Sequence, residues 1–234
     1  MKILAIGAHP DDLEISCAGT LAKLVKAGHE VVLCHASNGD KGHYEIPPQE
    51  LARIRQREAK QAGEVIGCKT VTLGLKDGEI KASDENARLA VLELIRSVEP
   101  DFIITHDPND YMPDHVEVSK LVFDMSFLAT VPGFSDRFPP AGKVPALFYM
   151  DNLSGMHFQP TLYVDISETF DTKIDMLRCH QSQLQWLKEH DNVDIVDCVE
   201  TLAKMRGMQA GCKYAEGFIQ HMVWTRPNAI RFPV

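Results

Sequence analysis

The feature that most constrains the fold of this chain is an alternation between short apolar segments and longer amphipathic ones. Helix-like stretches near 13–28, 49–66 and 84–98 separate four segments that are rich in strand-favouring residues. These four segments read KILAIGA, EVVLCHAS, KTVTLGL and DFIITH. Such an alternation is typical of a parallel sheet whose strands are joined by crossover helices.

Helix-ending residues stand where this pattern requires them. Gly28 follows the first helix-like stretch, Gly67 the second and Pro100 the third, and glycine or proline commonly follows the end of a helix. Ser83 is the expected N-cap of the third helix. We therefore predict an α/β protein with a Rossmann-like, mostly parallel sheet, helices on both faces and an active site at the carboxyl ends of the strands.

The alternation weakens in the second half of the chain. The segment 130–145, TVPGFSDRFPPAGKVP, predicts a long loop of the kind that often lies over an active site. Two further strands, ALFYMDN and LYVDIS, are expected next, followed by helices over 168–190 and 193–211. His180 is expected to be a packed residue of the first of these helices.

Composition excludes several classes of protein. The 234 residues, 44% of them hydrophobic, suffice for one sizeable core, so we expect a single domain spanning 1–234. A net charge of -9 without a basic cluster argues against nucleic-acid or membrane binding and favours a small-molecule substrate. No apolar run is long enough to cross a bilayer, and the first residues do not read as a secretory signal, so we expect a cytoplasmic protein. We also expect a homo-oligomer.

The segment GAHPDD places His9, Asp11 and Asp12 directly after the first predicted strand. A phosphate-binding turn needs a helix N-terminus that is free for an anion, whereas carboxylates occupy this one. Carboxylates with a histidine suit a divalent cation instead. The alternative is that Pro10 and the two aspartates only begin a helix, with the acids near its positive end.

A second cluster of histidines and aspartates follows the fourth predicted strand, in THDPNDYMPDH. Its members are expected at the same edge of the sheet as the first cluster, where they can complete a zinc site of three protein ligands and one open position. Taken alone, a histidine such as His115 is more often a structural or surface residue than a metal ligand. The candidates in this cluster are His106, Asp107, Asp110, Asp114 and His115.

These motifs resemble those of the LmbE-like (PIG-L) family of zinc-dependent de-N-acetylases, which remove acetyl groups from N-acetylglucosamine derivatives. The resemblance implies that His9, Asp12 and His115 hold zinc, or another divalent ion. It also implies that Asp11 is the general base and that Asp114 assists catalysis, for instance by orienting a ligand. The segments that carry the resemblance are GAHPDDLEISCAGTL, RIRQREAKQAGEVIG, DYMPDH, YVDIS and YAEGF.

One position departs from the family pattern. Many relatives have a histidine where this chain has Met112, and that histidine is thought to stabilise the oxyanion. Methionine cannot donate a hydrogen bond. Either zinc alone stabilises the oxyanion, or activity is reduced, or another donor substitutes; the candidate donors are His106, Tyr111 and His157.

Further residues are candidates for binding substrate. Arg55 matches the position of a family arginine, although it could also be a solvated charge on a helix surface. Asp40 and His43 follow the second predicted strand and could bind sugar hydroxyls, unless that segment is only a mobile glycine loop. Tyr111 is the remaining candidate contact.

The expected function is therefore zinc-dependent hydrolysis that deacetylates an N-acetylated amino sugar or its conjugate. Two alternatives remain open at this point. The same site would serve a metal-dependent hydrolase of another amide or ester bond. A relative that binds zinc but is catalytically weakened at Met112 is the other possibility.

Overall fold

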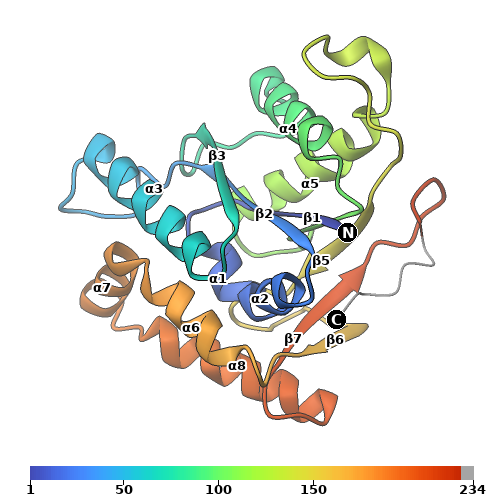
Figure 1. Cartoon of the computed structure of the whole chain (residues 1–234). Helices are drawn as coiled ribbons and strands as arrows, with labels where there is room; N and C mark the ends of the chain where they lie inside the picture. Colours follow the sequence, from blue (N-terminus) through green and yellow to red (C-terminus); the bar gives the residue numbers. More distant parts are fainter. Residues whose placement is uncertain (228–234) are drawn as a thin grey trace.

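Residues 1–227 are described by the structure, a computed structural model of the chain. Their strands form one seven-stranded sheet in the order β3-β2-β1-β4-β5-β7-β6 (Figure 1). Strands β1 to β5 run parallel to one another, whereas β7 is antiparallel to both β5 and β6. The bounds are β1 Lys2–Gly7, β2 Glu30–Ser37, β3 Lys69–Leu75, β4 Phe102–His106, β5 Ala146–Met150, β6 Leu162–Asp165 and β7 Ala215–Gln220.

Helices cover both faces of the sheet, which confirms the predicted fold class. Side chains of α4 and α5 form one core with the sheet, and those of α1, α2, α3, α6 and α8 form the other. Figure 1 shows α6, α7 and α8 gathered below the sheet. The bounds are α1 Asp12–Ser16, α2 Ala18–Lys26, α3 Pro48–Val65, α4 Glu85–Val98, α5 Pro113–Leu128, α6 Phe170–Arg178, α7 Gln181–His190 and α8 Ile195–Ala210.

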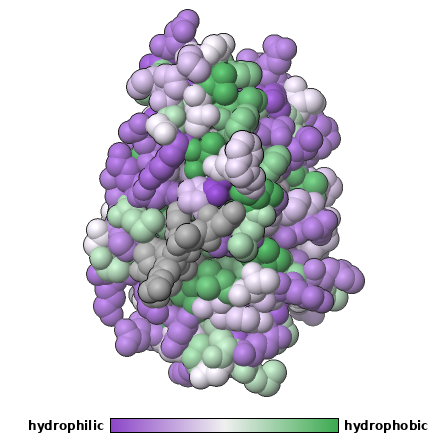
Figure 2. Space-filling view, turned by 90° about the vertical axis from the view of Figure 1, so that its right-hand side faces the viewer, coloured by the Kyte–Doolittle hydropathy of each residue, from purple (hydrophilic) through white to green (hydrophobic). Residues whose placement is uncertain are grey.

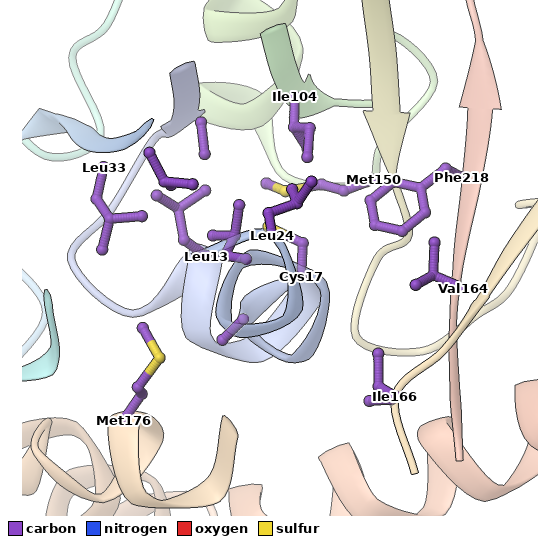
Figure 3. Close-up of a cluster of buried hydrophobic side chains, with 14 of the residues drawn as sticks. Leu13, Cys17, Leu24, Leu33, Ile104, Met150, Val164, Ile166, Met176 and Phe218 are labelled. Atoms are coloured by element: carbon purple, nitrogen blue, oxygen red, sulfur yellow. The ribbon is translucent and has the colours of Figure 1, made fainter. Parts of the chain in front are cut away.

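Residues of the parallel strands alternate between the two cores, as the pleat requires. Ile3 of β1 packs in the core under α2, whereas Leu4 packs in the core under α4 and α5. Because both faces are buried, these strands read as continuous apolar runs. Figure 3 shows the core under α2, where Leu24 lies near Ile104 of β4.

The first predicted helix is broken in two at Cys17. In a continuous helix the Gly19 N–H would donate to the Ile15 carbonyl. Instead, the Gly19 N–H donates to a Glu216 carboxylate oxygen at 3.0 Å, and the Ile15 carbonyl accepts from Lys173 Nζ at 2.7 Å. Lys173 and Glu216 are buried and 2.7 Å apart, so an ion pair from distant segments is inserted into the hydrogen-bond ladder of the helix.

Two predictions about local structure were wrong at their boundaries. The side chain that caps α4 belongs to Asp84, not Ser83, and accepts from the Ala87 N–H. The helix predicted over 168–190 is two helices, α6 and α7, and His180 is fully buried in the turn between them. The strand β7 was not predicted.

The expectation that segment 130–145 covers the active site is also wrong. This segment leads from the end of α5 to the start of β5, so it lies at the amino edge of the parallel strands. Buried Arg96 at the end of α4 holds it there by donating to the carbonyls of Ala129 and Val131. The loop therefore lies at the edge opposite to the predicted site.

Some apolar side chains are exposed on the surface of the molecule, and Figure 2 shows hydrophobic areas between polar ones on one face. Phe127 of α5 is 46% exposed and Trp224 is 91% exposed. Exposed apolar patches often mark protein interfaces, and the expected homo-oligomer stays a prediction. Within residues 1–227, no helix combines the length and the apolar character that crossing a bilayer would require.

Candidate metal centre

The predicted ligand clusters meet at the carboxyl edge of the sheet. His9, Asp11 and Asp12 follow β1, and the second cluster follows β4 at its side. His9, Asp11 and Asp12 of the first cluster and Asp110 and His115 of the second line a cleft of about 240 Å³. A larger groove of about 610 Å³ lies between α3 and β3, but the candidate metal-binding groups of the described residues are all at the carboxyl edge.

Three side chains converge on one point in the cleft. The ligand atoms of His9, Asp12 and His115 lie within 4.8 Å of one another. Asp12 Oδ1 is 3.2 Å from His115 Nε2, and Asp12 Oδ2 is 3.4 Å from His9 Nδ1. His115 Nε2 is buried without a hydrogen-bond partner. An unpaired imidazole nitrogen beside a carboxylate and a second imidazole is a donor set that fits zinc.

In His9 and in His115, the ring nitrogen on the side away from Asp12 contacts another carboxylate. His9 Nε2 lies 3.2 Å from Asp114 Oδ2, and His115 Nδ1 lies 3.0 Å from Asp110 Oδ2. Such contacts fix the tautomer of a metal-binding histidine and turn its other nitrogen toward the ion. The arrangement therefore directs His9 Nδ1 and His115 Nε2 toward Asp12.

Electrostatics at the cluster follow from this packing. Burial opposes the charge of Asp12, yet the adjacent histidines hold the pKa of its carboxyl well below the ordinary value. Burial also opposes protonation of His115, but Asp12 and Asp110 raise its pKa to about 9. In contrast, burial together with His115 lowers the pKa of His106 to about 4. The carboxylate is thus ionised and ready to bind a cation.

Asp11 is held in a strained conformation beside the cluster. Its φ is 133°, a region that residues other than glycine rarely adopt and that costs about 1–3 kcal/mol. Arg55 donates to Asp11 Oδ1 at 3.1 Å and to the Pro10 carbonyl at 2.7 Å, which stabilises this turn. Burial raises the pKa of Asp11, with Arg55 opposing the shift.

The remaining predicted residues occupy different positions. Arg55 is 2% exposed and lines the cleft, which excludes the solvated helix-surface alternative. Tyr111 also lines the cleft. Asp114 is buried behind His9, where it accepts from the Gly78 N–H. Asp40 does not line the cleft and accepts from the Asp77 N–H.

His43 lies at the rim rather than in the cleft. It follows Gly42, which lines the cleft, and its Nδ1 accepts from the backbone N–H of Glu45. Among the candidate oxyanion donors, His106 is 2% exposed and its Nε2 accepts from the Ala8 N–H. His157 is not among the described residues that line the cleft.

Asp77 was missed by the reasoning from sequence. Its carboxylate lies 3.3 Å from His9 Nε2 and 3.6 Å from Arg55 Nη1, and it lines the cleft. A signal was present, because Asp77 follows β3 just as Asp11 follows β1. The second half of the chain adds Asn152 and Gln183 to the cleft wall, without any motif that marks them.

Comparison with known proteins identifies the family of this chain. The family model of PIG-L, described as GlcNAc-PI de-N-acetylase, matches residues 4–126, slightly more than half of the chain. The diacetylchitobiose deacetylase of Thermococcus kodakarensis is 30% identical over 223 residues, which cover 92% of this chain and 81% of the relative.

Solved structures have the same fold. The N,N'-diacetylchitobiose deacetylase of Pyrococcus horikoshii is 25% identical with a TM-score of 0.81, covering 94% of this chain and 83% of that one. The 4-carboxy-2-hydroxymuconate hydratase GalB of Pseudomonas putida has a TM-score of 0.83 at 20% identity, over 98% and 99% of the two chains, which shows a shared fold alone. Because the family model covers slightly more than half of the chain, including both candidate ligand clusters, and the archaeal relative is 30% identical over 92% of it, this protein belongs to the PIG-L family of de-N-acetylases, which are metal-dependent amidohydrolases.

Proposed function

We propose that this protein removes the acetyl group from an N-acetylated derivative of glucosamine and that zinc is the ion it uses. The observation that carries the proposal is the convergence of His9, Asp12 and His115 beside Asp11 in one cleft. Zinc hydrolases have three protein ligands and one open position. The relatives named diacetylchitobiose deacetylase support an acetylated amino sugar as the substrate class.

The reaction needs a base that is close to the cluster and correctly oriented. When bound, zinc would supply Lewis acidity, which polarises an amide carbonyl and makes water a better nucleophile. Asp11 accepts the proton of the attacking water and then delivers it to the leaving amine. Its raised pKa favours this second step, and Arg55 keeps its carboxylate in position.

The substitution at Met112 leaves the oxyanion without the donor that many relatives have. Met112 lines the cleft at the start of α5, and its thioether cannot donate. Of the three candidate donors, Tyr111 is the one that lines the cleft among the described residues. We therefore assign the stabilisation of the oxyanion to the Tyr111 hydroxyl, together with the ion.

The proposal is tested by metal analysis and by product analysis on the same preparation. We expect about one zinc per chain, with stoichiometric acetate and free amine released from N-acetylglucosamine or its glycosides. A panel of other amides and esters tests the rival hydrolase. Acetate release confined to that panel, or a His115→Ala variant with the same metal content as the wild type, would contradict the proposal.

A further inference from the structure

Four aromatic rings lie together at the rim of the cleft, outside the metal cluster. Trp186 is stacked on His190 with ring centroids 4.3 Å apart, and its centroid is 4.8 Å from that of Tyr44. His43 lies 5.7 Å from Tyr44 and 5.3 Å from Trp186. We call these four residues the aromatic rim: His43, Tyr44, Trp186 and His190.

The aromatic rim is joined directly to the cleft. Gly42, which precedes His43, lines the cleft, and so do Gln183 and Leu187 on the same helix as Trp186. The Gly42 carbonyl accepts from Gln183 Nε2 at 3.1 Å, which ties the loop after β2 to α7. Figure 1 shows this loop and α7 on the same side of the molecule.

Contacts among the four rings leave part of the aromatic rim exposed. Tyr44 is 61% exposed although it contacts other rings. The backbone N–H groups of Glu45 and Ile46 both donate to His43 Nδ1, which holds the imidazole in place beside Tyr44. Aromatic surfaces with polar groups at their edges suit ligands that have an apolar face and a polar edge.

The size of the cleft indicates what the rim would bind. Its volume of about 240 Å³ is below the roughly 300–1,000 Å³ of ordinary ligand pockets. It therefore accommodates the acetylated residue itself, and anything attached to that residue must leave through the mouth. A pyranose ring has C–H groups on its faces and hydroxyls around its edge, which matches the rim.

We propose that the aromatic rim is a binding subsite for the second sugar ring of a saccharide whose acetylated residue lies in the cleft. Tyr44 provides the stacking surface, and Trp186 supports it from behind. This inference rests on the proposed function for the identity of the first residue. It makes the protein selective for disaccharides and longer saccharides over free N-acetylglucosamine.

Binding can be followed by tryptophan fluorescence, a readout that is separate from acetate release. The chain has two tryptophans, Trp186 and Trp224. Trp224 is 91% exposed and belongs to neither cleft nor rim, so Trp224→Phe leaves Trp186 as the single fluorescent reporter. In this background we expect N,N'-diacetylchitobiose to change the Trp186 emission saturably. N-acetylglucosamine at equal concentrations should produce less than a quarter of the change.

Matched variants at Tyr44 identify the contact. Tyr44→Ala should weaken disaccharide binding about five- to tenfold, the size expected for one aromatic stacking contact. Tyr44→Phe keeps the ring and should bind like the parent. In acetate-release assays, the same Tyr44→Ala change should raise KM for the disaccharide by this factor, with kcat within twofold and KM for the monosaccharide changed by less than twofold.

The outcomes separate the subsite from the reaction. If neither sugar releases acetate, the proposed function fails, and the fluorescence titration still decides the subsite. If acetate is released but Tyr44→Ala changes both sugars equally, the subsite is refuted and the function stands. Identical titrations for parent, Tyr44→Ala and Tyr44→Phe, or no response to the disaccharide, would also refute it.

Discussion

The two halves of this molecule differ in what they contribute to the cleft. Residues 1–128 contain the parallel strands β1 to β4 and every candidate metal ligand found within residues 1–227, and the family model ends within this half. Residues 146–220 contain β5 to β7 and α6 to α8, and they add Asn152, Gln183 and Leu187 to the cleft wall. The difference teaches that the candidate metal site is built from the first half alone, whereas the cleft wall and the aromatic rim need residues of both halves.

The largest expected effect is loss of a residue from the first half. His115→Ala or Asp12→Ala should remove the metal and with it at least about 10³-fold in kcat/KM, because the ion and the base act together. Asp11→Asn should keep the metal and lose about 10²–10⁴-fold, since an amide cannot accept the proton of water. Elemental analysis and acetate release distinguish the two failures. Equal metal loss in both sets would show that Asp11 is itself needed to hold the metal, which contradicts its assignment as the base alone.

The next effect concerns the connection between the halves. Lys173→Met leaves the buried Glu216 carboxylate without its cation, so it should lower the free energy of unfolding by about 3–5 kcal/mol. The double variant Lys173→Met/Glu216→Gln should be more stable than the single one, because the Gly19 N–H and the Ile15 carbonyl can then pair. Urea unfolding measures both. A loss below about 1 kcal/mol in the single variant would show that the ion pair does not hold the halves together.

The carboxylates behind the histidines should have a smaller effect. Asp110→Ala should weaken zinc binding about 10–100-fold, because it removes the acceptor of His115 Nδ1. Asp110→Asn keeps an acceptor oxygen and should lose less. Chelator competition measures the affinity, with Gln183→Ala as the control from the second half. An equal loss of zinc affinity in the Gln183→Ala control would show that the second half also supports the metal site, which contradicts its assignment to the first half.

Metal affinity should also depend on pH. His115 has a pKa of about 9 without the ion, and an imidazole must lose its proton to bind a metal. The bound proton is therefore released on binding, so affinity should rise with pH below about 9, by about tenfold per pH unit for each proton released. Chelator competition at pH 6, 7 and 8 measures the slope. A flat profile would contradict the assignment of His115 as a ligand.

The smallest effect is expected at Met112. If Tyr111 already donates to the oxyanion, Met112→His should change kcat by less than tenfold, which corresponds to about 1.4 kcal/mol. In a Tyr111→Phe background the same substitution should restore turnover, whereas Met112→Leu should not. Steady-state kinetics decide this for four variants: Met112→His, Tyr111→Phe, Tyr111→Phe/Met112→His and Tyr111→Phe/Met112→Leu. A gain of tenfold or more in the wild-type background would show that the donor is missing.

The strands and the candidate site residues of the first half could be predicted from the sequence because the patterns that specify them are local. A strand followed by a polar turn places Asp11 or His106 at the carboxyl edge whatever the rest of the chain does. Asp77 obeys the same rule and could have been included. In the second half, β7 was missed because an antiparallel strand inserted between β5 and the edge strand β6 is specified by these neighbours rather than by its own pattern.

The sequence by itself determined the α/β class, the parallel order of βα units and the set of residues that gathers at the strand ends. Only the tertiary structure decided which nitrogen of His9 and of His115 faces Asp12, because Asp114 and Asp110 select it through contacts in three dimensions. It also decided the break in the first helix, where Glu216 reaches Gly19 across 197 positions of sequence. Hydrogen bonds and ion pairs between distant segments leave no periodicity along the chain, so no local pattern could have indicated them.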